Sequence, residues 1–227
     1  MIKPHGSETL NPLLVDDARR AELEKEAEGL PKVVVSSATA ANAVMMGSGY
    51  FNPLTGFMDL EDALMTSDKM VMKNGTFFPV PVLNLLPDVS AIEGAGRIAL
   101  LDPNVDGNPV LAIQTVEKIE EATADQMKLM TDQVYRTDDT EHPGVAAFNG
   151  QGNFIVSGPI EVLNLSYFAS EFEGTFKTAG EIRDMIAKNG WNKVVAFQTR
   201  NPMHRAHEEL VRMAMDRVGA DGAVIHM

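Results

Sequence analysis

Cysteine is absent from this 227-residue sequence. Its absence excludes disulfide bonds, zinc or iron–sulfur sites with thiolate ligands, and catalysis by a thiol. No apolar run reaches the roughly 18 residues that a membrane-spanning helix needs, and the N-terminal segment contains no apolar signal-peptide stretch. The expectation is therefore a soluble cytoplasmic protein that does not bind membranes.

Basic side chains are also scarce, with 19 Lys and Arg against 32 Asp and Glu. Residues 1–176 hold 11 basic and 26 acidic side chains, a net charge of −15, whereas residues 177–227 hold 8 and 6, a net charge of +2. Binding to nucleic acids or anionic membranes depends on Lys and Arg, so the acidic segment argues against both partners. The second segment favours an anionic ligand, although a chance distribution of charges would look the same.

Residues 1–176 combine short helices with a β-rich stretch. Helices are expected over residues 16–29, capped by Asp16 or Asp17, and from a Ser37 cap to about Met46. Strands are expected at residues 33–35 and, from residue 76 on, in TFFPVPVLNL, GRIALLD, NPVLAIQTVEKIE and NFIVSGPIEVL. Residues 167–177 are expected to form a linker. The pattern predicts a compact mixed-β domain that ends near residue 176.

Residues 177–227 alternate between helix and strand. Thr178 and Glu181 have the spacing of a capping box, so a helix is expected to begin there and to end at Gly190. Two short apolar runs, KVVAF and GAVIHM, are typical of buried parallel strands and flank the amphipathic segment AHEELVRMAMDRVG. This alternation indicates a Rossmann-like α/β sheet. Because two strands cannot complete such a sheet, the chain is expected to be the N-terminal part of a longer protein.

The segment QTRNPMHRAH (198–207) joins the first of these strands to the amphipathic helix. Ligands of α/β sheets bind outside the carboxyl ends of the strands, where a helix N-terminus offers unpaired N–H groups. His204 and His207 are expected on one face of the helix's first turn. Five side chains here can donate hydrogen bonds and carry no negative charge: Gln198, Arg200, Asn201, His204 and His207. They predict an anion-binding site, with a solvated turn and structural histidines as the simpler alternatives.

Paired histidines also serve as zinc ligands. The metalloprotease spacing is i, i+4 with a glutamate between the two histidines. Here the spacing is i, i+3, and Arg205 and Ala206 lie between them. The sequence therefore predicts no metal bound by the protein itself.

The segment VVAFQTRNPMHRAHEEL (194–210) resembles the signature of the ATP sulfurylase (sulfate adenylyltransferase) family. YFNPLTGFM, NGTFFPVPVLNL and TAGEIRDMIAKNGWNKVVAF resemble other parts of the same family, so the resemblance spans nearly the whole chain. It implies an α/β protein with a mixed-β PUA-like domain over residues 1–176. A Rossmann-like nucleotidyltransferase domain would begin at residue 177 and be incomplete here.

The resemblance also implies an activity. The family reversibly joins sulfate to the α-phosphate of MgATP, which gives adenosine 5′-phosphosulfate and pyrophosphate, and Mg²⁺ is carried by ATP. Sulfate would be bound by Gln198 and Arg200, and the catalytic segment would be Thr199, Arg200 and Asn201. The residues implied for ATP binding are Gln198, Thr199, Arg200, Asn201, His204 and His207. A homo-oligomer is also expected.

Other functions stay open. The two-histidine segment is shared with adenylyltransferases that act on phosphopantetheine or nicotinamide mononucleotide, which the Gln-Thr-Arg-Asn string and the long N-terminal domain disfavour. A PUA-like binding module could instead contact RNA, and the charge of −15 over residues 1–176 argues against this. The chain could also be a folding fragment without activity of its own.

Overall fold

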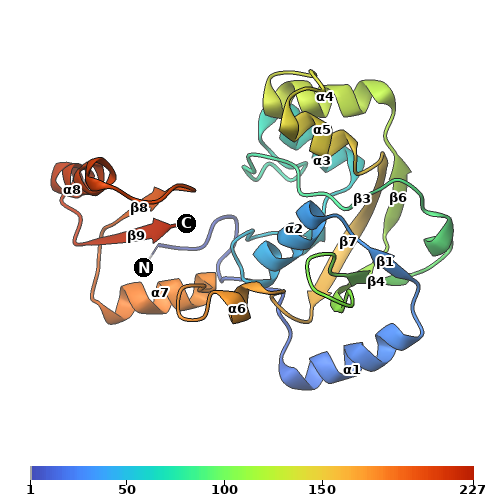
Figure 1. The fold of residues 1–227 in the computed structure, drawn as a ribbon, viewed down its shortest axis with the longest axis horizontal. Coiled ribbons are helices and arrows are strands. Elements are labelled where there is room, and N and C mark those ends of the chain that lie inside the picture. Colours follow the sequence, from blue (N-terminus) through green and yellow to red (C-terminus); the bar gives the residue numbers. More distant parts are fainter. Residues whose placement is uncertain (1) are drawn as a thin grey trace. The chain divides into compact units, whose positions relative to one another are not determined.

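The computed structural model describes residues 2–227. They divide into two compact units, one formed by Lys3–Phe176 and one that contains Lys177–Met227. Within residues 2–227, no helix is both long enough and apolar enough to cross a lipid bilayer. Figure 1 shows the helices and strands of both units.

The Lys3–Phe176 unit mixes strands with short helices. Its strands are β1 (Lys32–Val34), β2 (Gly56–Phe57), β3 (Leu85–Leu86), β4 (Arg97–Leu101), β5 (Val110–Thr115), β6 (Lys118–Glu121) and β7 (Phe154–Val162). Its helices are α1 (Asp17–Glu28), α2 (Ser37–Gly47), α3 (Leu60–Lys69), α4 (Ala124–Tyr135), α5 (Pro143–Asn149) and α6 (Phe168–Glu171), with a 3-10 turn at Ser90–Ile92. The strands follow the order β1-β4-β5-β7-β2, with β3 and β6 also paired to β7. Apart from the parallel pair β1–β4, these pairings are antiparallel.

Helices α1 and α2 pack on opposite faces of this sheet. Neighbouring residues of a strand point to opposite faces, and in β4 the side chain of Ala99 packs with Leu23 of α1, whereas Ile98 and Leu100 belong to the cluster that contains Val44 of α2. Both clusters are buried. The sheet is therefore covered by apolar side chains on both sides, which gives this unit a complete core of its own.

Strand β7 changes partners at Gly158. Residues before it pair with β6 and β3, and residues after it pair with β5. The φ of Gly158 is +133°, and a Cβ at this position would lie 2.1 Å from the carbonyl oxygen of Thr115. A Cβ at Gly56 of β2 would lie 2.0 Å from the carbonyl oxygen of Gly158. Glycine is required at both positions because two backbones approach each other there.

Several local expectations for this unit are corrected by the structure. Residues 76–84 form no strand beyond an isolated bridge between Phe77 and Val71, since prolines 79 and 81 remove backbone donors, and β3 begins only at Leu85. Ser36 rather than Ser37 caps α2, because the Ser36 side chain accepts the amide of Thr39. Helix α5 was not expected; it begins with Pro143 at its first position, and His142 caps it. Residues 167–177 contain the short helix α6 and a group of contacting aromatic rings.

The unit that contains Lys177–Met227 is built from α7 (Ala179–Lys188), β8 (Val194–Gln198), α8 (Arg205–Val218) and β9 (Gly222–His226). The expected capping box of α7 is confirmed: Thr178 accepts the amide of Glu181, and the Glu181 carboxylate accepts the amide of Thr178. These hydrogen bonds lower the pKa of Glu181. Strands β8 and β9 pair in parallel from Val194–Gly222 to Gln198–His226, and α8 ends at Gly219, whose φ is +62°.

Two features set the register of this parallel pair. The Asp221 carboxylate accepts the backbone amides of Asn192 and Lys193 at 2.9–3.0 Å, and these hydrogen bonds lower its pKa. At Gly222 a Cβ would lie 2.1 Å from the indole of Trp191, so the ring packs directly on the glycine backbone. Both contacts hold the start of β9 against the residues that precede β8.

Candidate active site

The candidate site is the loop 198–207, which runs from the last residue of β8 into the first turn of α8. Gln198 is the last residue of β8 and lies opposite His226 of β9. The next amide, of Thr199, donates to the His226 carbonyl oxygen at 2.9 Å. The loop therefore starts at the edge where both parallel strands end, which is the position at which α/β sheets bind their ligands.

Thr199 shapes the first turn of this loop. Its hydroxyl donates to the carbonyl oxygen of Asn201 and accepts the amide of the same residue, each at 3.1 Å. This is a local side-chain turn of the kind that Ser and Thr form. Because the hydroxyl already donates and accepts, it acts in this structure as a shaping group, and the exposed side chains of Arg200 and Asn201 project from the turn it makes.

Arg200 provides positive charge that the rest of the site does not neutralise. Within residues 2–227 it has no ion pair or hydrogen bond. The nearest acidic residues along the chain, Glu208 and Glu209, pair instead with Arg212 at 3.0 and 3.5 Å. The guanidinium is therefore free to bind an anion, and its planar N–H groups suit a bidentate contact with an oxyanion.

The two histidines lie at the start of α8. His204 is the N-cap residue, and the His207 ring lies against it with ring centroids 4.0 Å apart. The Phe197 ring of β8 contacts His207 at 5.6 Å between centroids. The expectation that both histidines stand on the first helical turn is corrected: His204 has extended backbone and precedes the helix. The pair meets because the cap residue and the third helical residue lie over the same helix end.

Of the predicted site residues, the structure brings together Thr199 with Asn201 and His204 with His207. Gln198 and Arg200 are exposed, and no contact joins either side chain to the others among the described residues. Sequence reasoning missed Phe197 and His226. The register of the two parallel strands would have placed His226 beside Gln198, because their carboxyl ends meet at one edge.

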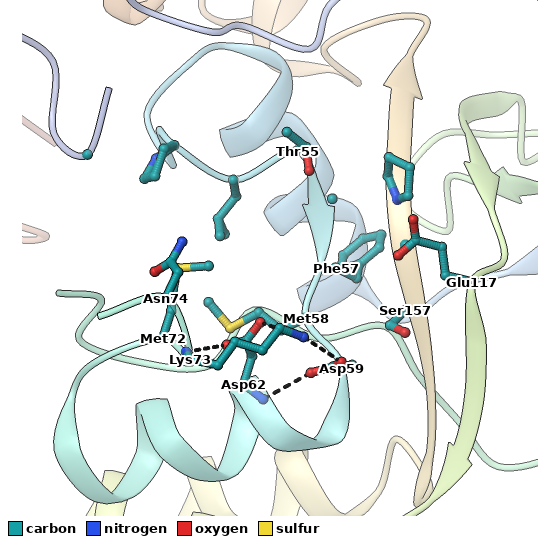
Figure 2. Close-up of a pocket in the computed structure, with 16 residues that line it drawn as sticks. Thr55, Phe57, Met58, Asp59, Asp62, Met72, Lys73, Asn74, Glu117 and Ser157 are labelled. Carbon is teal, nitrogen blue, oxygen red and sulfur yellow. Dashed lines mark hydrogen bonds and ion pairs between the residues drawn. The ribbon is translucent and has the colours of Figure 1, made fainter. Parts of the chain in front are cut away.

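A hollow with a volume of about 400 Å³ lies in the Lys3–Phe176 unit. Asp59 and Asp62 line it, and both side chains are buried (Figure 2). Asp59 caps α3 and forms 2.7 Å ion pairs with Lys73 and Lys118. Burial raises the pKa of Asp59, but hydrogen bonds from the Asp62 amide, Lys118 and Lys73 outweigh it and hold the pKa well below its usual range. These charges satisfy one another, so the cluster stabilises the fold.

Among residues 2–227, no group of three or more His, Asp or Glu side chains is arranged to hold a metal ion. The loop 198–207 itself offers amide, hydroxyl, imidazole and guanidinium groups and no carboxylate.

Both parts of the chain match known protein families. Residues 2–165 match the family of PUA-like domains. The chain belongs to the PUA-like domain family. Residues 173–227 match the ATP-sulfurylase family, so the PUA-like domain is followed by the segment that contains the candidate site. The α/β fold with an N-terminal PUA-like domain is confirmed, as is the resemblance to the ATP-sulfurylase family.

Curated relatives are similar to this chain over its full length, in the PUA-like domain and in the segment that follows it. The chain is 59% identical to a sulfate adenylyltransferase of Allochromatium vinosum and 58% identical to one of Alcanivorax borkumensis, each over 100% of this chain and 57% of the relative. It therefore spans a little over half the length of these relatives. Among solved structures, "Hexameric APS kinase from Thiobacillus denitrificans" matches with a TM-score of 0.73 and 25% identity, over 100% of this chain and 39% of that one.

Proposed function

We propose that these residues belong to a sulfate adenylyltransferase, which transfers the AMP group of ATP to sulfate and gives adenosine 5′-phosphosulfate and pyrophosphate. The observation that carries the proposal is the loop 198–207. It places two histidines and an arginine, which has no partner within residues 2–227, at a helix N-terminus beside the carboxyl ends of two parallel strands. The names of the relatives support the same reaction.

The chemistry requires an oxygen of sulfate to attack the α-phosphorus of ATP. A bond forms between that oxygen and the phosphorus, the bond to the bridging oxygen of the β-phosphate breaks, and its electron pair leaves with pyrophosphate. Sulfate is a dianion at neutral pH and needs no general base, which agrees with a loop that contains no carboxylate between Gln198 and His207. Positioning and charge neutralisation must then supply the acceleration, as in phosphoryl transfer.

The proposed roles follow the position of each residue on the loop. Gln198 and Arg200 bind sulfate, with Arg200 providing the positive charge. Thr199 holds the turn that aims Arg200 and Asn201 at the α-phosphate. His204 and His207 face the phosphates of ATP from the positive end of α8.

Mg²⁺ is proposed to arrive with ATP. It prefers carboxylate, phosphate and water oxygens, and the loop offers none of the carboxylates that would hold the ion on the protein. The donor set therefore does not fit a resident magnesium site, and binding of the ion falls to the ATP phosphates.

The organisation of the whole protein follows from the same proposal. We assign residues 1–176 to the PUA-like domain and residues 177–227 to the α/β catalytic domain. The likeness to a protein described as hexameric supports a homo-oligomer. Light scattering coupled to size exclusion would show a single mass that is a multiple of the protomer mass.

The site is tested by competition between oxyanions in the enzyme that carries these residues. The donors recognise shape and charge rather than the central atom, so selenate and molybdate should compete with sulfate. Planar nitrate and acetate should compete far more weakly. Initial rates of pyrophosphate release, with each anion titrated against sulfate, give the comparison. Acetate competing as well as selenate would rule out a tetrahedral anion pocket at Gln198 and Arg200.

A further inference from the structure

Helix α8 begins with an unusual cap that is made of two histidines. Capping boxes ordinarily use Ser or Thr at the cap and Glu or Gln three residues later. Here the Nδ1 atom of His204 accepts the amide of Ala206 at 3.3 Å, and the Nδ1 atom of His207 accepts the amide of His204 at 3.4 Å. The two rings thus perform the reciprocal hydrogen bonding of a capping box.

These two hydrogen bonds determine where the ring protons lie. A backbone amide only donates, so the ring nitrogen that faces it must accept and cannot carry a proton. A neutral imidazole has one N–H and one acceptor nitrogen, and the bond made by one nitrogen sets the state of the other. Each ring therefore carries its proton on Nε2. An imidazolium would place an N–H against the capping amide and break the cap.

The Nε2–H groups are left free to bind a ligand. Among residues 2–227, neither Nε2 atom has a hydrogen-bond partner. The rings hold each other at 4.0 Å between centroids, and Phe197 contacts His207 from β8, so both rings have fixed positions. The amides of the first helical turn add their positive end to the same place.

We infer that the α8 cap locks His204 and His207 in the Nε2–H tautomer, so that the pair presents two neutral, directed N–H donors to the anionic ligand. This rests on the proposed function for the identity of the ligand, a phosphate group. Under this inference, Arg200 supplies the positive charge of the site, and the two histidines supply neutral hydrogen-bond donors that point at the ligand. Both histidines are then positioning donors whose orientation depends on the helix cap.

The tautomers are measured directly in the free chain by long-range ¹H–¹⁵N correlation spectra of the imidazole rings near neutral pH. The expected result is an unprotonated Nδ1 and a protonated Nε2 in both rings. His204→Asn and His207→Gln assign the signals, since each removes one ring. Both variants also keep the cap, because Asn is a strong N-cap residue and Gln serves at the third position.

The same variants test the donor role with inorganic pyrophosphate as the probe. Amide exchange at Ala206 should stay slow in His204→Asn and become fast in His204→Ala. Pyrophosphate binding, measured by calorimetry, should weaken roughly tenfold or more in both cap-preserving variants, the scale of one hydrogen bond to a charged group.

A proton on Nδ1 of either ring, or a doubly protonated ring near neutral pH, would overturn the inference. So would pyrophosphate binding in both cap-preserving variants that equals the parent's. If the parent chain bound no pyrophosphate, the proposed function would fail, whereas the tautomer spectra would still decide between a locked and an unlocked pair.

Discussion

The two units of this chain differ in whether their apolar and charged side chains have packing or ion-pair partners. In the Lys3–Phe176 unit, apolar side chains fill both faces of the sheet, and buried charges such as Asp59 have partners. In the unit that contains Lys177–Met227, Gly222 is the one buried residue described, and large apolar side chains of α8 stand exposed, with Leu210 at 53% and Met213 at 61%. Arg200 there lacks a partner within residues 2–227. The first unit uses its residues for stability, whereas the second contains charged and apolar groups without partners among residues 2–227, as the proposed anion site requires.

The largest expected effect is on the stability of the first unit. Gly158→Ala places a Cβ 2.1 Å from the Thr115 carbonyl oxygen at a φ of +133°, so we expect a loss of about 3 kcal/mol in the free energy of unfolding. Urea denaturation followed by circular dichroism measures it. Gly94→Ala is the matched control, because its φ is also positive but its Cβ would meet open space. Equal losses of unfolding free energy in the two variants would show that the positive φ, and not the close approach of the two backbones at Gly158, causes the destabilisation.

Arg200→Lys should affect the reaction and leave stability unchanged. Lysine keeps the charge but cannot make a bidentate contact, so the rate of pyrophosphate release in the full enzyme should fall at least about a hundredfold, the scale of one lost transition-state donor. The matched control is Arg212→Lys on the same unit, whose partners are Glu208 and Glu209 on the helix surface and which should change the rate little. A rate within a few-fold of the parent would remove Arg200 from the reacting anions.

Asp59→Asn should act in the opposite sense, with lower stability and unchanged pyrophosphate binding. The substitution leaves Lys73 and Lys118 without the carboxylate that they share. We expect a loss of about 2 kcal/mol, below the full cost of breaking a buried pair because both lysines are half-exposed. Weaker pyrophosphate binding in this variant would show that the two units are energetically coupled.

The same carboxylate predicts a pH dependence. The folded pKa of Asp59 lies below its usual value, so its contribution is complete above the unfolded pKa of about 4 and is lost as the pH falls through the folded pKa. The difference in unfolding free energy between the parent and Asp59→Asn should therefore shrink as the pH is lowered below about 4. A difference that grew with acid would contradict the assignment.

The smallest effect is expected at Asp221. Asp221→Asn weakens the hydrogen bonds to the amides of Asn192 and Lys193, which lower the pKa of this exposed carboxylate. Amide exchange at these two residues should become faster, and exchange in β4 and β5 of the other unit should not change. Faster amide exchange in both units would contradict this, because it would show that the stability of one unit depends on the other.

Local signals were enough to predict much of the second unit. The Thr178 capping box, the parallel strands β8 and β9 and the glycine after α8 each depend on residues close in sequence, and the structure confirms them. The expected burial of the two strands is wrong, because Gly222 is the one buried residue that the structure describes in them. The first unit was harder because its pairings are distant. Residues 76–84 have strand-like composition, yet their prolines keep them out of the sheet. The partner change at Gly158 depends on Thr115 and Gly56, which no short window contains.

The candidate site likewise combines features that the sequence predicts with features that depend on the fold. Its residues could be recognised as a string of donors, because they are contiguous in the chain. The role of His204 as the N-cap of α8 could not be predicted, because N-cap residues are usually Ser, Thr, Asp or Asn and not His. The partners of each group also depend on the fold: Glu208 and Glu209 turn to Arg212, and this leaves Arg200 unpaired among the described residues.

The packing of Trp191 on Gly222 gives the chain an optical probe. It is the single tryptophan of the sequence, and its indole lies on the glycine backbone at the start of β9, where a methyl group would not fit. Excitation at the red edge of protein absorption therefore reports on the unit that carries the candidate site, whereas Tyr50, Tyr135 and Tyr167 all belong to the other unit. Emission wavelength and quenching by iodide would follow the opening of the β8–β9 pair without any label.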